Sequence, residues 1–192
     1  MLFRTFVFEG RQFVVDWGVF HPVRHLSGIA FAEQLSYLLS SHASGAVTAL
    51  DLGTGCGLLA ATLARLELSV VATDLNNQAV ACAVHNCFGL DVDVRHGDMF
   101  APVEGESFDL AVVNPPFERA HPTRRRNSAF TSPDFLERLG ARTHEFTPTL
   151  VLGFPIDEAA TLEATGLELA LWRTVGTAGR DLGLFVSHRT SS

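Results

Sequence analysis

The sequence contains no lysine. All 14 of its basic residues are arginine, and 21 acidic residues give the chain a formal net charge of -7. Phosphate-binding loops of the Walker type and Schiff-base chemistry both require a lysine ammonium group, so neither is available to this chain. The acidic excess also argues against a general nucleic-acid-binding protein, because contacts to phosphates normally need a broadly basic surface.

Cysteine is scarce, and the sequence has no long apolar run. Cys56, Cys82 and Cys87 are odd in number and lack Cys-x-x-Cys spacing, which disfavours a zinc knuckle or a disulfide framework. None of the eight histidines forms a cluster with metal-ligand spacing. No segment has the length of a bilayer span or the pattern of a signal peptide. We therefore expect a soluble, cytoplasmic protein that binds neither metal nor membrane.

The distribution of apolar residues predicts the fold. The chain has 192 residues, 47% of them hydrophobic, which fits a single domain over residues 1–192. The leading segment, 1–20, contains two β-rich runs joined by a glycine turn, which predict a hairpin. Over 46–192, apolar strands alternate with helices, which predicts an α/β fold with a doubly wound, mostly parallel sheet. The expected strands are 46–50, 69–73, 92–95, 110–113, 146–154, 167–172 and 184–188, and the expected helices are 27–39, 58–66, 77–88, one capped near Ser132, and 157–164.

A glycine-rich motif, Asp51 to Gly57, lies where the first strand of this core becomes a helix. Glycines at such a position let a ligand approach backbone N–H groups, although a purely structural turn would look the same. A dinucleotide fingerprint would need a glycine at Leu58, so a dehydrogenase is disfavoured. The expected ligand contacts come from Asp51, Gly53, Thr54, Gly55 and Gly57.

Acidic residues follow the next two strands. The carboxylate of Asp74, with Leu75 beside it, is placed to accept the hydroxyls of a ribose, or else it is a helix N-terminal acid. Asp98 is placed to accept an adenine amino group, with Met99 against the ring, although a Gly-Asp pair alone is usually a turn.

The tetrapeptide Asn114-Pro115-Pro116-Phe117 ends the fully apolar strand 110–113. Two consecutive prolines fix the backbone and donate no hydrogen bonds, so the segment presents carbonyl oxygens and the Asn114 amide oxygen in a rigid array. That array suits a planar NH2 group, whose hydrogens Asn114 and the Pro115 carbonyl would accept while Phe117 stacks on its plane. The alternative is a proline-stiffened strand end.

These motifs together resemble the Rossmann-like S-adenosylmethionine methyltransferases that carry a D/N/S-P-P-F/Y/W motif, over residues 46–117. The segments 10–15 and 18–22 also look like the hairpin region of the HemK-type protein-glutamine methyltransferases. The resemblance implies S-adenosylmethionine as cofactor, Asn114, Pro115, Pro116 and Phe117 as the catalytic tetrapeptide, Asn114 also near the cofactor, and a glutamine side-chain amide as acceptor. The chain departs from the family by His21-Pro22-Val23-Arg24-His25 in place of Pro-Arg-Pro-Glu-Thr, by Phe117 in place of tyrosine, and by the expected lack of an N-terminal docking domain.

The methyl acceptor stays open between protein, nucleic acid and small molecule. Arg124, Arg125 and Arg126 follow the tetrapeptide and are placed to hold an anionic substrate, although a solvated loop fits equally well. The alternatives are an RNA or DNA amino-methyltransferase that acts on an extruded base, a small-molecule N-methyltransferase, and a non-catalytic cofactor-binding partner of another methyltransferase.

Overall fold

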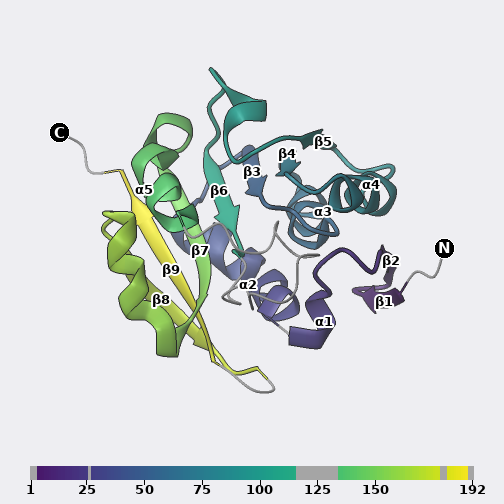
Figure 1. Ribbon diagram of the computed structural model, residues 1–192, viewed down its shortest axis with the longest axis horizontal. Helices are drawn as coiled ribbons and strands as arrows, with labels where there is room; N and C mark the ends of the chain where they lie inside the picture. The colour runs from purple at the N-terminus through teal and green to yellow at the C-terminus, as the bar shows by residue number, and fades with distance from the viewer. Residues whose placement is uncertain (1–3, 26, 116–133, 178–180, 190–192) are drawn as a thin grey trace.

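A central sheet of seven strands and a separate two-stranded sheet make up the fold (Figure 1). The computed structural model describes residues 4–25, 27–115, 134–177 and 181–189. The strands are β1 Arg4–Phe8, β2 Arg11–Val15, β3 Thr48–Leu52, β4 Ser69–Asp74, β5 Val92–His96, β6 Leu110–Val113, β7 Thr149–Pro155, β8 Ala170–Val175 and β9 Leu182–His188. The helices are α1 Pro22–His25, α2 Ser27–His42, α3 Leu58–Arg65, α4 Asn77–Asn86 and α5 Phe135–Phe146, with 3-10 turns η1 Ala101–Val103 and η3 Ile156–Thr165.

The topology of the large sheet confirms the predicted doubly wound α/β fold. The strand order is β5-β4-β3-β6-β7-β9-β8. Strands β3 to β7 run parallel, whereas β9 runs antiparallel to β7 and to β8. The chain leaves β3 first toward β4 and later returns to its other side as β6, so the order reverses between β3 and β6. Ligands of such sheets bind outside the carboxyl ends of the strands at this reversal.

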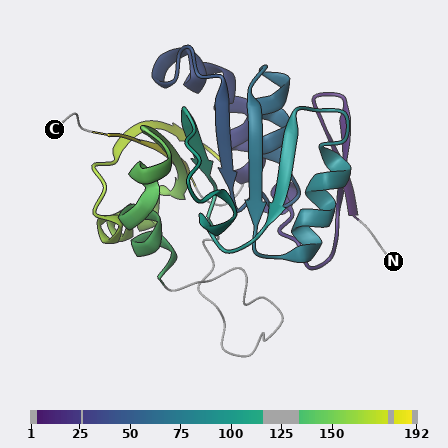
Figure 2. The same ribbon diagram turned by 90° about the horizontal axis from the view of Figure 1, so that it is seen from above.

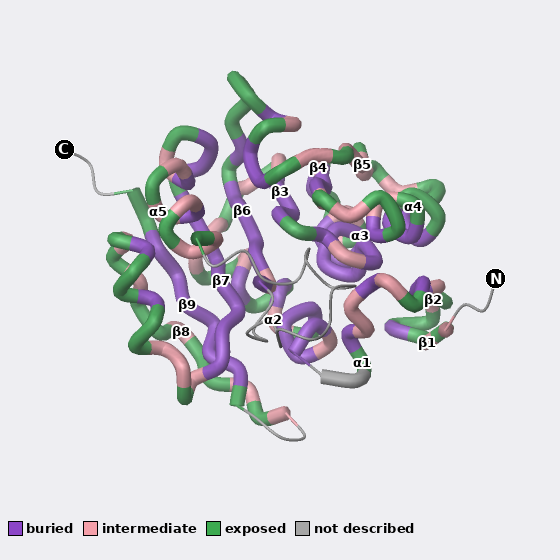
Figure 3. Tube along the Cα trace, in the orientation of Figure 1, coloured by how far each residue is buried: buried purple, intermediate pink, exposed green. Residues whose placement is uncertain are grey.

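Alternating side chains of the central strands build two hydrophobic cores. Leu110 and Val112 of β6 pack with helices α2, α3 and α4, whereas Ala111 and Val113 pack with α5, η1 and η3. Because successive side chains of a strand point to opposite faces, a strand that is apolar at every position needs cover on both sides. The central strands are accordingly buried along nearly their whole length (Figure 3).

The predicted N-terminal hairpin is present and packs beside α4 (Figure 2). Its turn residues Glu9 and Gly10 both have positive φ, 45° and 76°, which matches the twist that two-residue hairpin turns require. The side chain of Asn86, at the end of α4, makes the two hydrogen bonds with Val14 that the backbone of a neighbouring strand would make. The Asn86 side chain accepts from the Val14 N–H and donates to the Val14 carbonyl, both at 2.8 Å. The same side chain donates to the Cys56 carbonyl at 2.8 Å, so the hairpin, α4 and the glycine motif share one buried residue.

Several predicted boundaries were wrong. Strand β3 extends to Leu52 because Oδ2 of the polar residue Asp51 accepts hydrogen bonds from Thr54 of the glycine motif and from Ala60 of α3, which accommodates this carboxyl inside the sheet. Phe146 ends α5 and does not begin β7; its ring is buried and stacks on Phe100 at 4.5 Å. Helix α4 ends at Asn86, and Phe88 is largely exposed.

Further boundary differences lie near the C-terminus and after the hairpin. Strand β8 covers Ala170–Val175, three residues later than expected, because Leu167 and Leu169 pack into the second core without pairing. The segment expected as a helix over 157–164 is the 3-10 turn η3, and the short helix α1 was not expected. Apolar spacing alone does not distinguish a paired strand residue from one that is simply buried.

Candidate functional site

A pocket opens at the carboxyl ends of β3, β4 and β6, where the topology places the ligand site. Most of the residues predicted from the sequence to form the site do line this pocket. They come from strand ends and loops that are far apart in the chain. These are Asp51, Gly53, Thr54, Gly55, Asp74, Leu75, Asp98, Met99, Asn114 and Pro115. Pro116, Phe117, Arg124, Arg125 and Arg126 lie outside the described residues, so their roles stay predictions.

The glycine turn has a backbone that only glycine adopts easily. Gly53 and Gly55 have φ of 76° and 59°, and a Cβ on either would meet no atom within 4 Å. The requirement at these two positions is therefore conformational, and the space beside them is open to a ligand. The N–H groups of Gly53 and Thr54 both donate to the Thr73 carbonyl at 2.9 Å, which fixes the turn to the end of β4.

Gly57 does not line the pocket. Its missing side chain faces α4, where a Cβ would lie 3.0 Å from both Ala83 Cα and Cys87 Sγ. Gly57 is also the N-cap residue of α3, in a left-handed conformation with φ of 83°. The structure thus gives Gly57 a packing function, and its expected contact with the cofactor stays a prediction.

Asp51 is a buried carboxylate with one free oxygen. Its Oδ2 accepts from Thr54 Oγ1 at 2.6 Å and from the Ala60 N–H at 3.0 Å. Its Oδ1 is buried and has no hydrogen-bond partner among the described residues. Burial raises the pKa of Asp51 from 3.8 to about 7, against the opposing effect of these two hydrogen bonds. A buried acceptor without a partner costs about 1 to 3 kcal/mol, which a ligand donor in the pocket would recover.

Asp74 is held at both carboxylate oxygens. Oδ1 accepts from the Asn76 N–H at 2.8 Å and Oδ2 from the Gly55 N–H at 2.9 Å. Burial raises the pKa of Asp74, and these bonds oppose that shift. The carboxylate therefore joins the glycine turn to the start of α4, and it still has lone pairs for ribose hydroxyls. The alternative foreseen for Asp74, an acid at a helix N-terminus, was wrong, because Asp74 ends β4 and the N-cap of α4 is Asn76.

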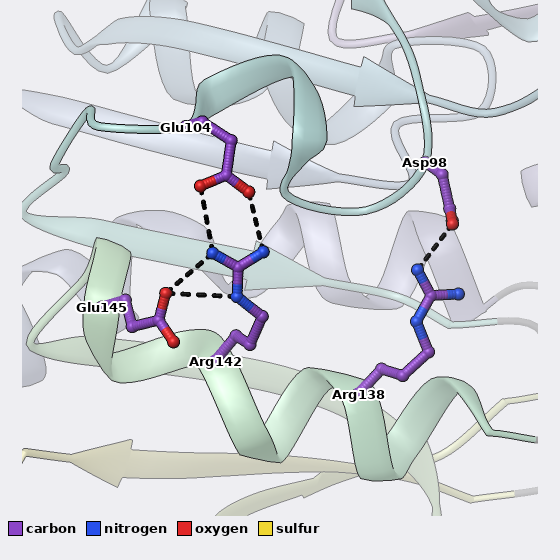
Figure 4. Close-up of polar contacts among 5 residues, drawn as sticks. All are labelled: Asp98, Glu104, Arg138, Arg142 and Glu145. Carbon is purple, nitrogen blue, oxygen red and sulfur yellow. Dashed lines mark hydrogen bonds and ion pairs between the residues drawn. The ribbon is translucent and has the colours of Figure 1, made fainter.

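Asp98 lies at the rim and forms an ion pair that the sequence did not indicate. Its Oδ2 is 2.5 Å from Arg138 Nη2 of α5 (Figure 4). The two side chains are 47% and 40% exposed. Arg138 and Phe135, one helical turn apart, both line the pocket. No signal in the sequence pairs residues 98 and 138, because their contact depends on how α5 packs over the sheet.

Asn114 directly follows β6, and its side-chain amide oxygen is a second buried acceptor. Its Oδ1 is buried and has no hydrogen-bond partner among the described residues. Gly153 of β7 leaves room for it, since a Cβ there would lie 3.4 Å from Asn114 Oδ1 and 2.9 Å from the Phe31 ring. Pro115, also buried, follows it into the pocket lining. Asn114 thus belongs to the lining of the pocket, and its expected role as an acceptor stays a prediction.

The segment after the hairpin forms a further wall of the pocket. Phe20 and Pro22 line the pocket beside Asp74. The segment is fixed to the start of α4, since Asn76 Nδ2 donates to the Gly18 carbonyl at 2.9 Å and Gln78 Nε2 donates to Asp16 at 3.0 Å. Pro22 belongs to the stretch that departs from the HemK-type pattern, so that departure is at the site itself.

The described parts of the chain contain neither a candidate metal site nor a helix that could span a membrane. In residues 4–25, 27–115, 134–177 and 181–189, no three His, Cys, Asp or Glu side chains form a group that could hold a metal ion. Among the helices described, none combines the length and the apolar character needed to cross a bilayer.

The methyltransferase small domain family model matches residues 28–131, which is more than half of the chain. This chain belongs to that family. It is 31% identical over 114 residues to the release factor glutamine methyltransferase of Enterococcus faecalis, covering 57% of this chain and 39% of that protein. It is 31% identical over 123 residues to the ribosomal protein uL3 glutamine methyltransferase of Burkholderia pseudomallei, covering 58% and 40%. The chain thus matches about two fifths of the length of these relatives.

Nucleic-acid methyltransferases are also among the similar proteins of this methyltransferase domain. Ribosomal RNA small subunit methyltransferase C of Alcanivorax borkumensis is 33% identical over 84 residues, covering 43% of this chain and 25% of that one. The 16S rRNA N2 G1207 methyltransferase of T. thermophilus, solved with AdoMet and guanosine, superposes with a TM-score of 0.63 at 22% identity, covering 99% and 51%. A protein methylase has a similar fold as well: the ribosomal protein L11 methylase of Lactobacillus delbrueckii superposes with a TM-score of 0.63 at 20% identity. The match covers 92% of this chain and 84% of that one. At these identities the two structures show the fold alone.

Proposed function

We propose that this protein is an S-adenosylmethionine-dependent methyltransferase that methylates the side-chain amide of a protein glutamine. One observation carries the proposal. Asp51 of β3 and Asn114, which directly follows β6, lie where the strand order reverses, and each has a buried oxygen without a partner among the described residues. Asp51 is a carboxylate and Asn114 a neutral amide, which suits a cationic donor beside β3 and a planar N–H donor beside β6. The glutamine methyltransferases among the relatives support the choice of acceptor.

The pocket residues fit the parts of this cofactor. Asp51 Oδ1 offers a negative acceptor to an ammonium group, and the open space beside Gly53 and Gly55 lets a chain pass close to the backbone. Asp74 is available to ribose hydroxyls, and Asp98 to a ring amine. When bound, S-adenosylmethionine supplies an electrophilic methyl group on a sulfonium.

The contribution of the chain to methyl transfer is mainly positioning. The Asn114 oxygen and the Pro115 carbonyl accept the two hydrogens of the acceptor NH2, which turns its lone pair out of conjugation and toward the methyl group. Neither residue would form a covalent bond, and the nitrogen would lose one of its two hydrogens as a proton to solvent when it gains the methyl group.

An RNA base amine is the second candidate acceptor. The similarity to ribosomal RNA small subunit methyltransferase C favours it, and a base amine is planar like an amide. The net charge of -7 counts against it, because a nucleic acid would be repelled beyond any local basic patch.

The test is transfer of a tritiated methyl group from S-adenosylmethionine into separate protein, RNA and small-molecule fractions of the source cell. We expect label in protein, recovered after hydrolysis as methylated glutamine. Label in RNA alone would establish the second candidate, and label in the small-molecule fraction a biosynthetic enzyme. No label in any fraction, with cofactor binding intact, would support a non-catalytic partner subunit.

A further inference from the structure

The ion pair between Asp98 and Arg138 differs from the other ion pairs that the structure describes. Both of its members line the pocket, whereas the remaining described pairs lie away from it. The side chain of Asp98 makes no other polar contact among the described residues, and it is 47% exposed, so packing does not fix its rotamer. Arg138 is therefore what holds this carboxylate at the rim.

Arg142, one turn further along α5, provides an internal comparison (Figure 4). It is paired at 2.7 and 3.1 Å with Glu104 and at 2.8 Å with Glu145, and none of these three residues lines the pocket. Its guanidinium also lies over the Phe146 ring, 5.1 Å from its centroid. Two arginines of one helix thus make short ion pairs, at 2.5 Å for Arg138 and at 2.7 and 2.8 Å for Arg142, but only Arg138 makes its pair at the ligand site.

We propose that Arg138 is a positioning residue that sets the preference of the pocket for an adenine ring. It holds Asp98 Oδ2, which leaves Oδ1 free to accept from a ring amine. An ionised carboxylate accepts hydrogen bonds but donates none, so a ring that presents a carbonyl at that place is repelled. This inference rests on the proposed function, since it takes the ligand to be S-adenosylmethionine with its adenine at Asp98.

The orientation of Asp98 matters more when the pocket is filled. In the free protein the pair is about half exposed, and water screens it. A ligand ring that covers the pair excludes that water, which strengthens both the ion pair and the hydrogen bond to the ring amine. Without Arg138, the bound ligand would have to hold the exposed Asp98 carboxylate in one position and remove its water while no positive charge is nearby. Both changes cost free energy and would weaken binding.

The experiment compares the dissociation constants of S-adenosylhomocysteine and S-inosylhomocysteine, which has a ring carbonyl in place of the 6-amino group. Calorimetry is carried out on the whole chain and on Arg138→Gln, Arg138→Lys and Arg142→Gln. We expect Arg138→Gln to weaken the adenine ligand about tenfold and to leave the inosine ligand almost unchanged. Arg138→Lys should restore part of the preference because it retains the charge, and Arg142→Gln should bind both ligands as the wild type does.

The outcomes separate this inference from the proposed function. If the wild type binds S-adenosylhomocysteine and Arg138→Gln keeps the same preference for adenine over inosine, the role of Arg138 is overturned but the proposed function is not. Equal weakening of both ligands also overturns it, because that pattern indicates general damage to the pocket. Failure of the wild type to bind S-adenosylhomocysteine overturns the proposed function itself. If Arg138→Gln does not fold, the wild type still tests the inference, since its adenine preference should fall with rising salt.

Discussion

The two ends of the pocket are held by different kinds of contact. Around Asp51 and Asp74, buried and partly buried carboxylate oxygens accept from N–H and hydroxyl groups within the glycine turn and the helix starts. At the rim, a half-exposed ion pair joins Asp98 to Arg138. Buried hydrogen bonds fix geometry and are hardly affected by salt, whereas an exposed ion pair is weak, screened and easily rearranged. The buried end is therefore suited to hold the reacting groups in place, and the rim to select among ligands.

The largest expected effect lies at the buried end, at Asn114. Asn114→Ala should keep the fold and most of the cofactor affinity, yet lower single-turnover methyl transfer by on the order of 100-fold, because alanine cannot hold the acceptor amide. The matched control is Asn77→Ala, an exposed asparagine outside the pocket. Asn114→Asp keeps an acceptor oxygen and should be milder than alanine. Normal turnover in Asn114→Ala would show that this oxygen does not orient the acceptor.

Asp74→Ala tests the middle of the pocket. It removes an acceptor for the ribose and also releases the Gly55 N–H. Cofactor binding should weaken by about 1 to 3 kcal/mol, as for the loss of charge-assisted hydrogen bonds. The measurement is calorimetric titration of the folded variant with S-adenosylhomocysteine. An affinity equal to that of the wild type would remove Asp74 from the ligand contacts.

The raised pKa of Asp51 predicts a pH dependence of binding. Burial raises this pKa to about 7, so the folded protein holds a proton that the unfolded chain releases near pH 4, and stability should fall as pH rises through that window. A cationic ligand group favours the ionised form, so affinity should rise about fivefold from pH 6 to 7 and about twofold more by pH 8, where it levels off. Dissociation constants measured from pH 5.5 to 8 check this. If Asp51→Asn showed the same pH profile, another group would be responsible.

The smallest effect is expected at the exposed pairs of α5 that lie outside the pocket. Arg142→Gln breaks contacts to Glu104 and Glu145, and exposed ion pairs contribute only about 0 to 1 kcal/mol. Urea denaturation should show a loss within that range and no change in ligand affinity. A larger loss in the free energy of unfolding would mean that the ion pairs of Arg142 stabilise α5 as strongly as buried hydrogen bonds do. The contrast between exposed ion pairs and the buried end of the pocket would then not hold.

The sequence predicted the buried end of the site better than its rim. Asp51, Asp74 and Asn114 each follow or end an apolar strand, and the carboxyl ends of parallel strands meet at one edge of the sheet. Local pattern and topology were therefore enough to bring them together. Arg138 was missed because it lies within a helix, with its pocket partner 40 residues away, so only the packing of α5 reveals the pair.

Residues with structural roles were also difficult to read from the sequence. Gly57 belongs to the same motif as Gly53 and Gly55, but its missing side chain faces α4 and not the pocket. Asn86, which links the hairpin to the glycine motif, has no local signal, because its partners Val14 and Cys56 are far away in the chain. A motif shows which residues are near a site, but the side on which each one packs depends on tertiary contacts.

The most direct test of the central claim, that the pocket beside Asp51 and Asn114 binds S-adenosylmethionine, is a calorimetric titration of the whole chain with S-adenosylhomocysteine and, separately, with a nicotinamide dinucleotide. We expect a saturable heat at one site for S-adenosylhomocysteine and none for the dinucleotide. Binding of the dinucleotide without detectable heat from millimolar S-adenosylhomocysteine would contradict it.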